Sequence, residues 1–346
     1  MNGTANYTFG FGNFGSWCSA TPSLAVCNLY YRRLLVQNNL AELGYGDPSA
    51  NITTSVAAAG VGVNPECFIP RRGHAGSLGN VGLIVACCFS FIFVSFMVMR
   101  ISQRIAAVAR QEMRILFLTY LAVVPMQLVT MGSLVEQGSK FLVIVTAVQE
   151  SLQSCIFWSL LACAVVMTQV VEDGTPASLL PHAIFYVAVF CMTLVVSLDV
   201  PFDFAHLAMH SRHQLVDLYN PTLYTITFLI PLVGATMYAL LITYVTLGKL
   251  QEFRPFGWSI LAGVLWAASL LVNFLWSLDL CYISNRRVDG SFLAVILQST
   301  AMWAIFQAWK RMTESEWGEE GDQTMDVFQN QQQGGYDKVA GDEHYQ

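Results

Sequence analysis

Charged residues are scarce in this chain of 346 residues. Only 12% are Asp, Glu, Lys or Arg, against about 25% in soluble globular domains, and 55% are hydrophobic. This composition excludes an ordinary soluble domain and a disordered chain, and it indicates a membrane protein. The net charge of −6 is concentrated near the end of the chain, because residues 313–346 contain nine acids and one lysine. The acidic balance therefore describes the tail and does not point to a basic partner.

A basic stripe with interleaved aromatic residues, the usual signature of nucleic-acid binding, is also missing from the sequence. We therefore expect no nucleic acid among the partners.

Seven apolar runs are long enough to cross the roughly 30 Å hydrocarbon core of a bilayer as helices. They lie at Gly76–Met99, Ile115–Val135, Val143–Val171, Leu179–Leu198, Leu223–Leu247, Trp258–Leu278 and Phe292–Trp309. Isolated strands would leave backbone groups unpaired in lipid, so the predicted fold is all-α and polytopic. We divide the chain into an N-terminal segment (1–75), a seven-helix membrane domain (76–309) and an acidic, largely disordered tail (310–346).

Two signals predict the orientation of the chain in the membrane. Glycosylation triplets begin at Asn2, Asn6 and Asn51, all before the first run, where they would face the lumen. Four arginines follow the first run within 15 residues of its end, and basic residues near the ends of spans favour the cytosolic side. They are Arg100, Arg104, Arg110 and Arg114. We therefore expect a lumenal N-terminus and a cytosolic C-terminus.

The nine cysteines divide by compartment in this topology. Five lie within the apolar runs, where cysteine is usually a small apolar side chain. Cys18, Cys27, Cys67 and Cys281 would all be lumenal, and an even number in an oxidising compartment implies two disulfides with three possible pairings. We favour Cys18 with Cys27 and Cys67 with Cys281.

One cluster of side chains has a spacing that suits a metal. Asp203, His206, His210 and His213 would share one face of a helix and could hold zinc. All four fall in a single lumenal loop, and no second group of ligands is found in another span. We therefore favour an amphipathic helix at the membrane interface over a zinc site, and expect no cofactor. Asn28–Leu43 likewise predicts a short amphipathic helix on the lumenal leaflet.

Ionisable residues are nearly absent from the apolar runs. Glu150 is the one acid, and it lies 21 residues before Val171, or about 32 Å of helix, which places it at the lumenal interface. A proton relay, a voltage sensor or a transporter of charged substrates would normally show ionisable groups within the spans. Gly73, Gly76, Gly79 and Gly82 recur every third residue, either as a close-packing row on a helix or as a loose entry segment.

The stretch Glu172-Asp-Gly-Thr-Pro176 joins the third and fourth runs on the cytosolic side. Gly174 favours a positive φ, and Pro176 can begin the next helix. Catalysis by Glu172 and Asp173 would need a pocket and a partner base, which a loop this short cannot build alone. From local sequence we favour a solvated turn.

The chain resembles the fungal chitin synthase export chaperones in an ordered set of short motifs. They are Phe11–Phe14, Cys18, Pro22 to Leu29, Pro65–Phe68, Arg110–Met113, Ala147–Gln149, Glu172–Pro176, Thr246-Leu247, Pro255 with Gly257, Cys281, Val288–Gly290 with Phe292, and Met312–Glu314 with Trp317. The set departs from the family at Gln111, where a basic residue is expected, and in a longer segment before the first span.

The resemblance implies a multi-pass chaperone of the endoplasmic reticulum that is needed for a chitin synthase to leave that compartment. Such a protein supports cell-wall chitin synthesis without catalysing it. Glu172, Asp173, Gly174, Asp289 and Gly290 become candidate contacts with the client, and the tail a candidate contact with an export coat. Two alternatives stay open: a membrane hydrolase using the histidine cluster, and a seven-span receptor.

Overall fold

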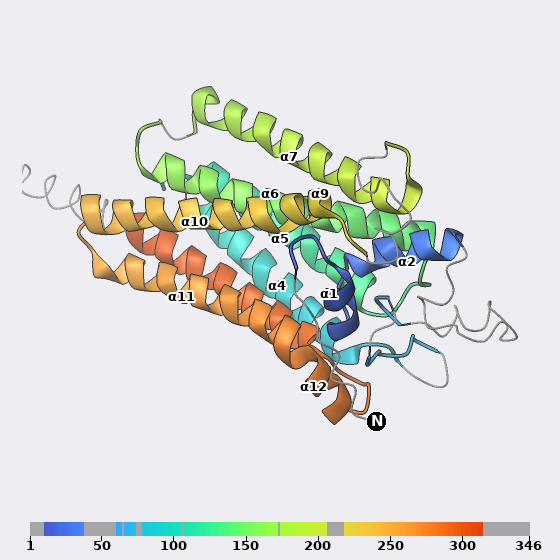
Figure 1. Cartoon of the computed structure of the whole chain (residues 1–346). Helices are drawn as coiled ribbons and strands as arrows, with labels where there is room; N and C mark the ends of the chain where they lie inside the picture. The colour runs from blue at the N-terminus through green and yellow to red at the C-terminus, as the bar shows by residue number, and fades with distance from the viewer. Residues whose placement is uncertain are drawn as a thin grey trace, which may run out of the picture.

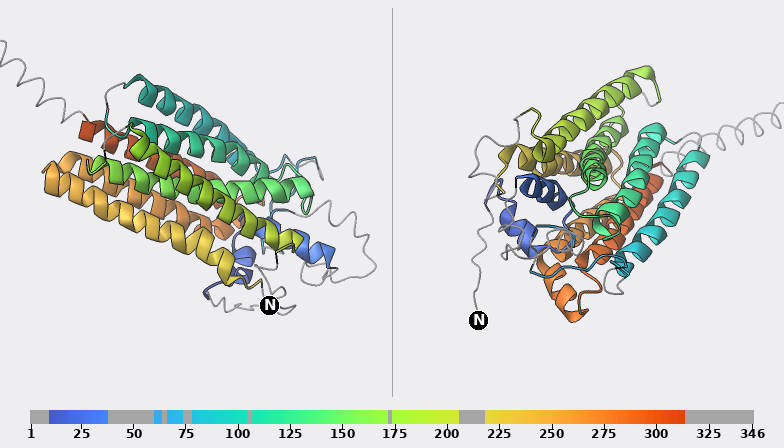
Figure 2. Two further views of the ribbon diagram at one scale, coloured as in Figure 1. Left: turned by 90° about the horizontal axis from the view of Figure 1, so that it is seen from above. Right: turned by 90° about the vertical axis from the view of Figure 1, so that its right-hand side faces the viewer.

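The computed structural model describes residues 10–37, 60–63, 66–73, 78–104, 107–171, 174–205 and 218–313. Seven helices in this part are long and apolar enough to cross a membrane, so the all-α, seven-span prediction is confirmed. They run side by side along one direction in Figures 1 and 2. The spans are α4 (Val81–Gln103), α5 (Arg110–Met131), α6 (Lys140–Met167), α7 (Pro176–Phe202), Pro221–Lys249, Phe253–Ile283 and Gly290–Thr313.

The fifth and sixth spans contain π-helical segments. The fifth consists of α9 (Pro221–Tyr224), η2 (Thr225–Leu229), α10 (Ile230–Thr243) and η3 (Tyr244–Lys249). The sixth consists of α11 (Phe253–Leu271), η4 (Val272–Trp276) and α12 (Ser277–Ile283).

Three of the spans begin at residues whose side chains satisfy one of the first backbone N–H groups of the helix. The side chains of Asn80, Ser139 and Asn220 accept hydrogen bonds from Leu83, Leu142 and Leu223, each three residues further on. Pro176 stands at the start of α7, where its missing N–H costs nothing. These polar first turns are invisible to hydropathy, which explains why several helices begin three to five residues before the apolar runs.

Residues 10–37 fold onto one end of the bundle and form two short helices, α1 (Gly15–Ala20) and α2 (Cys27–Val36) (Figure 1). We call this end the N-terminal end, and the other the opposite end. The prediction that α2 lies on the leaflet is wrong, because Leu29, Tyr30 and Leu34 are fully buried. They pack with residues of α6 and α7. Burial raises the pKa of the Tyr30 phenol well above its usual value, which keeps the ring neutral.

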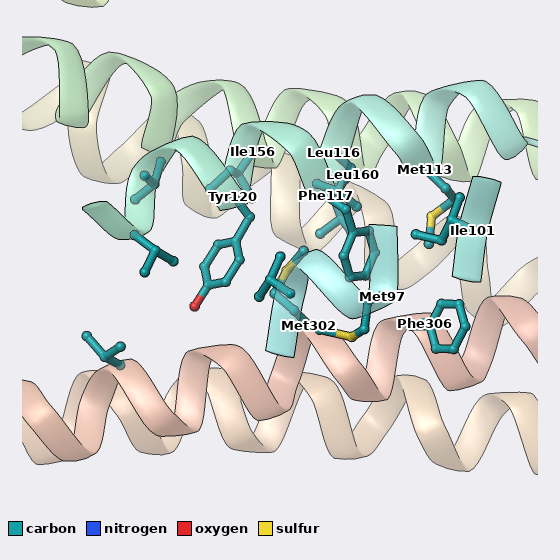
Figure 3. Close-up of a cluster of buried hydrophobic side chains, with 14 of the residues drawn as sticks. Met97, Ile101, Met113, Leu116, Phe117, Tyr120, Ile156, Leu160, Met302 and Phe306 are labelled. Carbon is teal, nitrogen blue, oxygen red and sulfur yellow. The ribbon is translucent and has the colours of Figure 1, made fainter. Parts of the chain in front are cut away.

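The main core lies between α4, α5, α6 and the helix Gly290–Thr313 (Figure 3). Met97 and Ile101 come from α4, and Phe117 comes from α5. Trp309, the last residue of the seventh apolar run, is buried in this core, and its indole N–H donates to the carbonyl of Val108 at 2.8 Å. The last helix is therefore fixed to the connection between α4 and α5.

The four glycines do not form a row on one helix, because Gly73 and Gly79 precede α4, which begins at Val81, and only Gly82 lies within it. Gly79 has a φ of +73°, and a Cβ there would stand 2.9 Å from the carbonyl oxygen of Gly132. The glycine thus lets two backbones meet at the N-terminal end. Gly76 lies outside the described residues.

Candidate functional site

The four cysteines of the N-terminal end form two disulfides. Cys18 is bonded to Cys27, and Cys67 is bonded to Cys281, which is the pairing favoured from the sequence. The first closes the short connection between α1 and α2. The second joins residues 214 positions apart and attaches the segment before α4 to the end of the sixth span.

An ion pair fixes α2 to the end of α7. Nη2 of Arg33 lies 2.7 Å from Oδ2 of Asp203, and Nη1 donates to the carbonyl of Val200 at 3.0 Å. The Arg33 side chain is 8% exposed and that of Asp203 is 38% exposed, so the guanidinium depends on this partner more than the carboxylate does. Asp203, one of the four suggested zinc ligands, is thus paired with an arginine.

A polar network holds the other side of α2. Asn28 donates to the carbonyl of Thr130 at 3.1 Å, at the end of α5. Gln137 donates to Oδ1 of Asn28 at 2.9 Å and to the carbonyl of Gly62 at 3.3 Å. Because all of these groups are buried, the network specifies one position for α2 on the bundle.

Asp289 and Gly290, which the family resemblance suggested as partner contacts, lie inside the protein. The Asp289 carboxylate is fully buried, and its Oδ1 accepts from Nδ2 of Asn80 at 2.9 Å and from both the backbone N–H and the hydroxyl of Ser291. A Cβ at Gly290 would stand 2.7 Å from the carbonyl oxygen of Val272. This pair joins the beginnings of α4 and the last helix, and it offers no surface to a partner.

The opposite end contains the connection between α6 and α7. Gly174 is exposed with a φ of +67°, as its position in a turn predicts, and nothing lies within 4 Å of an added Cβ. Lys249 donates to the carbonyl of Thr168 beside this connection. Glu172 and Asp173 lie outside the described residues.

Buried acids are more numerous than the sequence indicated. Glu112, near the start of α5, is fully buried and accepts from the Ser178 hydroxyl of α7, and Asp199 is fully buried near the end of α7. Glu150 is 17 residues, or about 26 Å of helix, from the end of α6 at Met167. Because α6, at 28 residues, is longer than a core of roughly 30 Å requires, the placement of Glu150 at the lumenal interface stays a prediction.

Hydropathy did not reveal Glu112 and Asp199 as buried acids, because the helices extend beyond the apolar runs. Glu112 and Asp199 stand just outside the runs, in turns that hydropathy assigns to loops. For Glu112, the signal available in the sequence was the motif Arg110–Met113 of the resembled family.

Several predicted sites lie outside the described residues. These are His206, His210 and His213, and the glycosylation candidates Asn2, Asn6 and Asn51. Within the described ranges no group of three or more His, Cys, Asp or Glu residues is arranged to hold a metal ion.

Comparison with known proteins gives one consistent family. The family described as "Chitin synthase export chaperone" matches residues 10–322. The chain is 23% identical over 313 residues to the chitin synthase export chaperone of Fusarium oxysporum, covering 89% of this chain and 83% of that protein. It is 21% identical over 310 residues to the one of Kluyveromyces lactis, covering 88% and 93%. No solved structure matches the chain.

Proposed function

Since this chain belongs to the chitin synthase export chaperone family, we propose that it is the membrane chaperone through which a chitin synthase folds and leaves the endoplasmic reticulum. The observation that carries the proposal is the extent of the family match. Residues 10–322 include both the N-terminal end and all seven spans, so the resemblance applies to the whole folded unit. The proposed client is a chitin synthase, and the proposed location is the endoplasmic-reticulum membrane.

The proposed orientation has the N-terminal end in the lumen. Both disulfides lie at that end, and disulfides form in oxidising compartments. Four arginines border the connection between α4 and α5 at the opposite end, as expected for a cytosolic side: Arg100, Arg104, Arg110 and Arg114. Endoglycosidase should increase the gel mobility of the protein, and Asn51→Gln should remove part of that shift. A glycosylated reporter fused after Gln346 would contradict this orientation.

We propose no catalytic role for the chain. The family is one of chaperones, and the membrane-hydrolase alternative depends on a histidine cluster whose one described member, Asp203, is paired with Arg33. His206→Ala combined with His210→Ala should therefore leave synthase export intact. Loss of a stoichiometric metal from the purified variant together with loss of export would favour the hydrolase.

The turn at Glu172–Pro176 is the proposed contact with the cytosolic side of the client, because Gly174 is exposed and Lys249 and Thr168 hold the neighbouring chain in place. Two carboxylates there can pair with basic residues of the synthase, with each exposed pair contributing at most about 1 kcal/mol. The acidic tail is a second proposed contact, with an export coat.

The test is the location of tagged chitin synthases in a strain that lacks this protein. At least one synthase should be retained in the endoplasmic reticulum, wall chitin should fall, and reintroduction of the gene should restore both. Normal surface delivery of every chitin synthase would refute the proposed function. We call a synthase that the deletion retains the client.

A further inference from the structure

A cavity of about 240 Å³ lies between α6, α10, α11 and the helix Gly290–Thr313. Its lining residues stand in the middle stretches of these spans: Gln153–Leu160 of α6, Ala235–Thr243 of α10 and Gln298–Ile305 of the last helix. On α11 they extend from Phe256 to Trp266. The cavity therefore lies at the depth of the hydrocarbon core, and apart from a few polar groups its walls are apolar.

The cavity opens sideways, toward the membrane, between α10 and α11. Ala239 and Thr243 of α10 and Ile260 and Gly263 of α11 line it and are also exposed, so they form its rim. The fifth and sixth spans bury a smaller share of their residues than the other five spans. The rim thus belongs to the two spans whose residues are least buried within the bundle.

Gln153 places a hydrogen-bond acceptor in the wall of this cavity. Its Oε1 is buried and has no hydrogen-bond partner among the described residues. An unsatisfied polar atom is costly in the hydrocarbon core, where bulk water does not reach. A lipid acyl chain offers no donor, so an occupant that suits this wall carries an N–H or O–H group.

The helices that form the rim are also irregular. In the described part of the chain, π-helical segments occur in the fifth and sixth spans alone, and η3 begins at Tyr244, directly after the rim residue Thr243. Such segments are rare and are frequent at functional sites. The π-helical segments are a separate observation from the cavity and from Gln153, and they occur in the two spans that form the rim.

We infer that the cavity between α10 and α11 receives a tryptophan or tyrosine side chain from a transmembrane helix of the client, whose N–H or O–H donates to Oε1 of Gln153. An apolar cavity of about 150 Å³ accepts benzene, so 240 Å³ admits an aromatic ring. The volume is below the roughly 300–1,000 Å³ of sites for whole small molecules, which disfavours a sterol. Small rim residues such as Ala239 and Gly263 let another helix approach closely. The inference rests on the proposed function.

Photo-crosslinking in cells tests this contact directly. A benzophenone amino acid replaces Ile260 at the rim or, as the control, Ile92, an exposed residue of α4 that does not line the cavity. We expect an adduct with the client from position 260 and none from position 92. Adducts with lipid or sterol alone at position 260, or equal client adducts at both positions, would overturn the inference.

Two substitutions, each read with the crosslinker at position 260, test the chemistry of the cavity. Ala239→Phe fills the mouth and should abolish the adduct, while Ala267→Phe, at an exposed position of α11 outside the cavity, should not. Gln153→Leu removes the acceptor and should reduce the adduct roughly three- to tenfold, the value of one hydrogen bond. An unchanged adduct in Ala239→Phe or in Gln153→Leu, with the protein at its normal level, would refute the proposed occupant.

The outcome for this site is separable from that for the proposed function. If the deletion strain retains the synthase but Ala239→Phe exports it normally and position 260 gives no adduct, the chaperone function stands and the cavity is not its client contact. If the deletion strain exports every synthase, the proposed function itself fails.

Discussion

Asp289 offers a decisive test of whether the Val288–Gly290 motif is structural or contacts the client. Asp289→Ala removes the acceptor for three buried donors: Nδ2 of Asn80, and the backbone N–H and hydroxyl of Ser291. Asn80 in turn caps α4 by accepting from Leu83, so the change disturbs the beginnings of two spans. The expected result is a destabilised membrane domain.

The magnitude follows from the number of donors left without an acceptor. Each unsatisfied buried donor costs about 1–3 kcal/mol, and Nδ2 of Asn80 keeps a second contact at 3.3 Å with Ser291. We therefore expect a loss of about 3–5 kcal/mol, a large part of the roughly 5–15 kcal/mol by which folded proteins are stable. Asp289→Asn keeps one acceptor oxygen and should cost about 1 kcal/mol.

The assay compares these variants with Asp279→Ala, which changes an exposed acid on α12 and should alter stability by about 0.5 kcal/mol or less. Thermal unfolding in detergent and the steady-state level of glycosylated protein should rank the variants, with Asp289→Ala lowest, then Asp289→Asn, then Asp279→Ala. If Asp289→Ala is as stable and abundant as Asp279→Ala while the client is retained, Asp289 is a contact residue and the structural reasoning is refuted.

Three further predictions concern the two ends of the bundle. Cys67→Ser should lower the abundance of the protein and leave Cys281 reactive to a lumenal thiol reagent, and an unreactive Cys281 would contradict the bond between them. Asp203→Ala leaves the buried guanidinium of Arg33 without its carboxylate partner, and should lower the free energy of unfolding by about 3 kcal/mol. Arg33→Met should cost less, because it removes the buried charge as well. Thermal unfolding compares the two variants, and the reverse order would refute this account. Glu172→Ala with Asp173→Ala should leave the protein at its normal level and partly retain the client in the endoplasmic reticulum, and export at the normal rate would show that the acids only mark the membrane edge.

The number and type of spans could be predicted because lipid imposes a strong condition on sequence. A helix in hydrocarbon must be about 20 residues long and apolar, and this signal is local. The ends of the helices could not be predicted as well, because protein rather than lipid surrounds them. Glu112 is buried against Ser178 of another span, and Arg33 is buried against Asp203. Polar turns with such partners extend the helices beyond the residues at which the apolar runs end.

The position of α2 could not be obtained from its own sequence. Its apolar residues predict an amphipathic helix equally well on a leaflet and on a protein surface. The decision comes from Asn28, because a membrane surface does not supply the fixed partners that the carbonyl of Thr130 and the amide of Gln137 provide. Both partners belong to segments more than 100 positions away, so no local pattern could identify them.

Asp289 shows why a shared motif does not by itself identify a contact surface. An aspartate followed by glycine in a short loop suggests an exposed turn, and a family motif in an exposed turn suggests a partner. Its hydrogen-bond partner Asn80 is 209 positions away, and the glycine is required by the approach of the Val272 carbonyl. The motif is therefore explained by the way the last span joins the first, without any partner. The turn at Gly174 differs, because an added Cβ there meets nothing within 4 Å and its glycine has no packing role. Of the two motif glycines, Gly290 is buried and Gly174 is exposed, so the turn at Gly174 is the better candidate for a contact with a client.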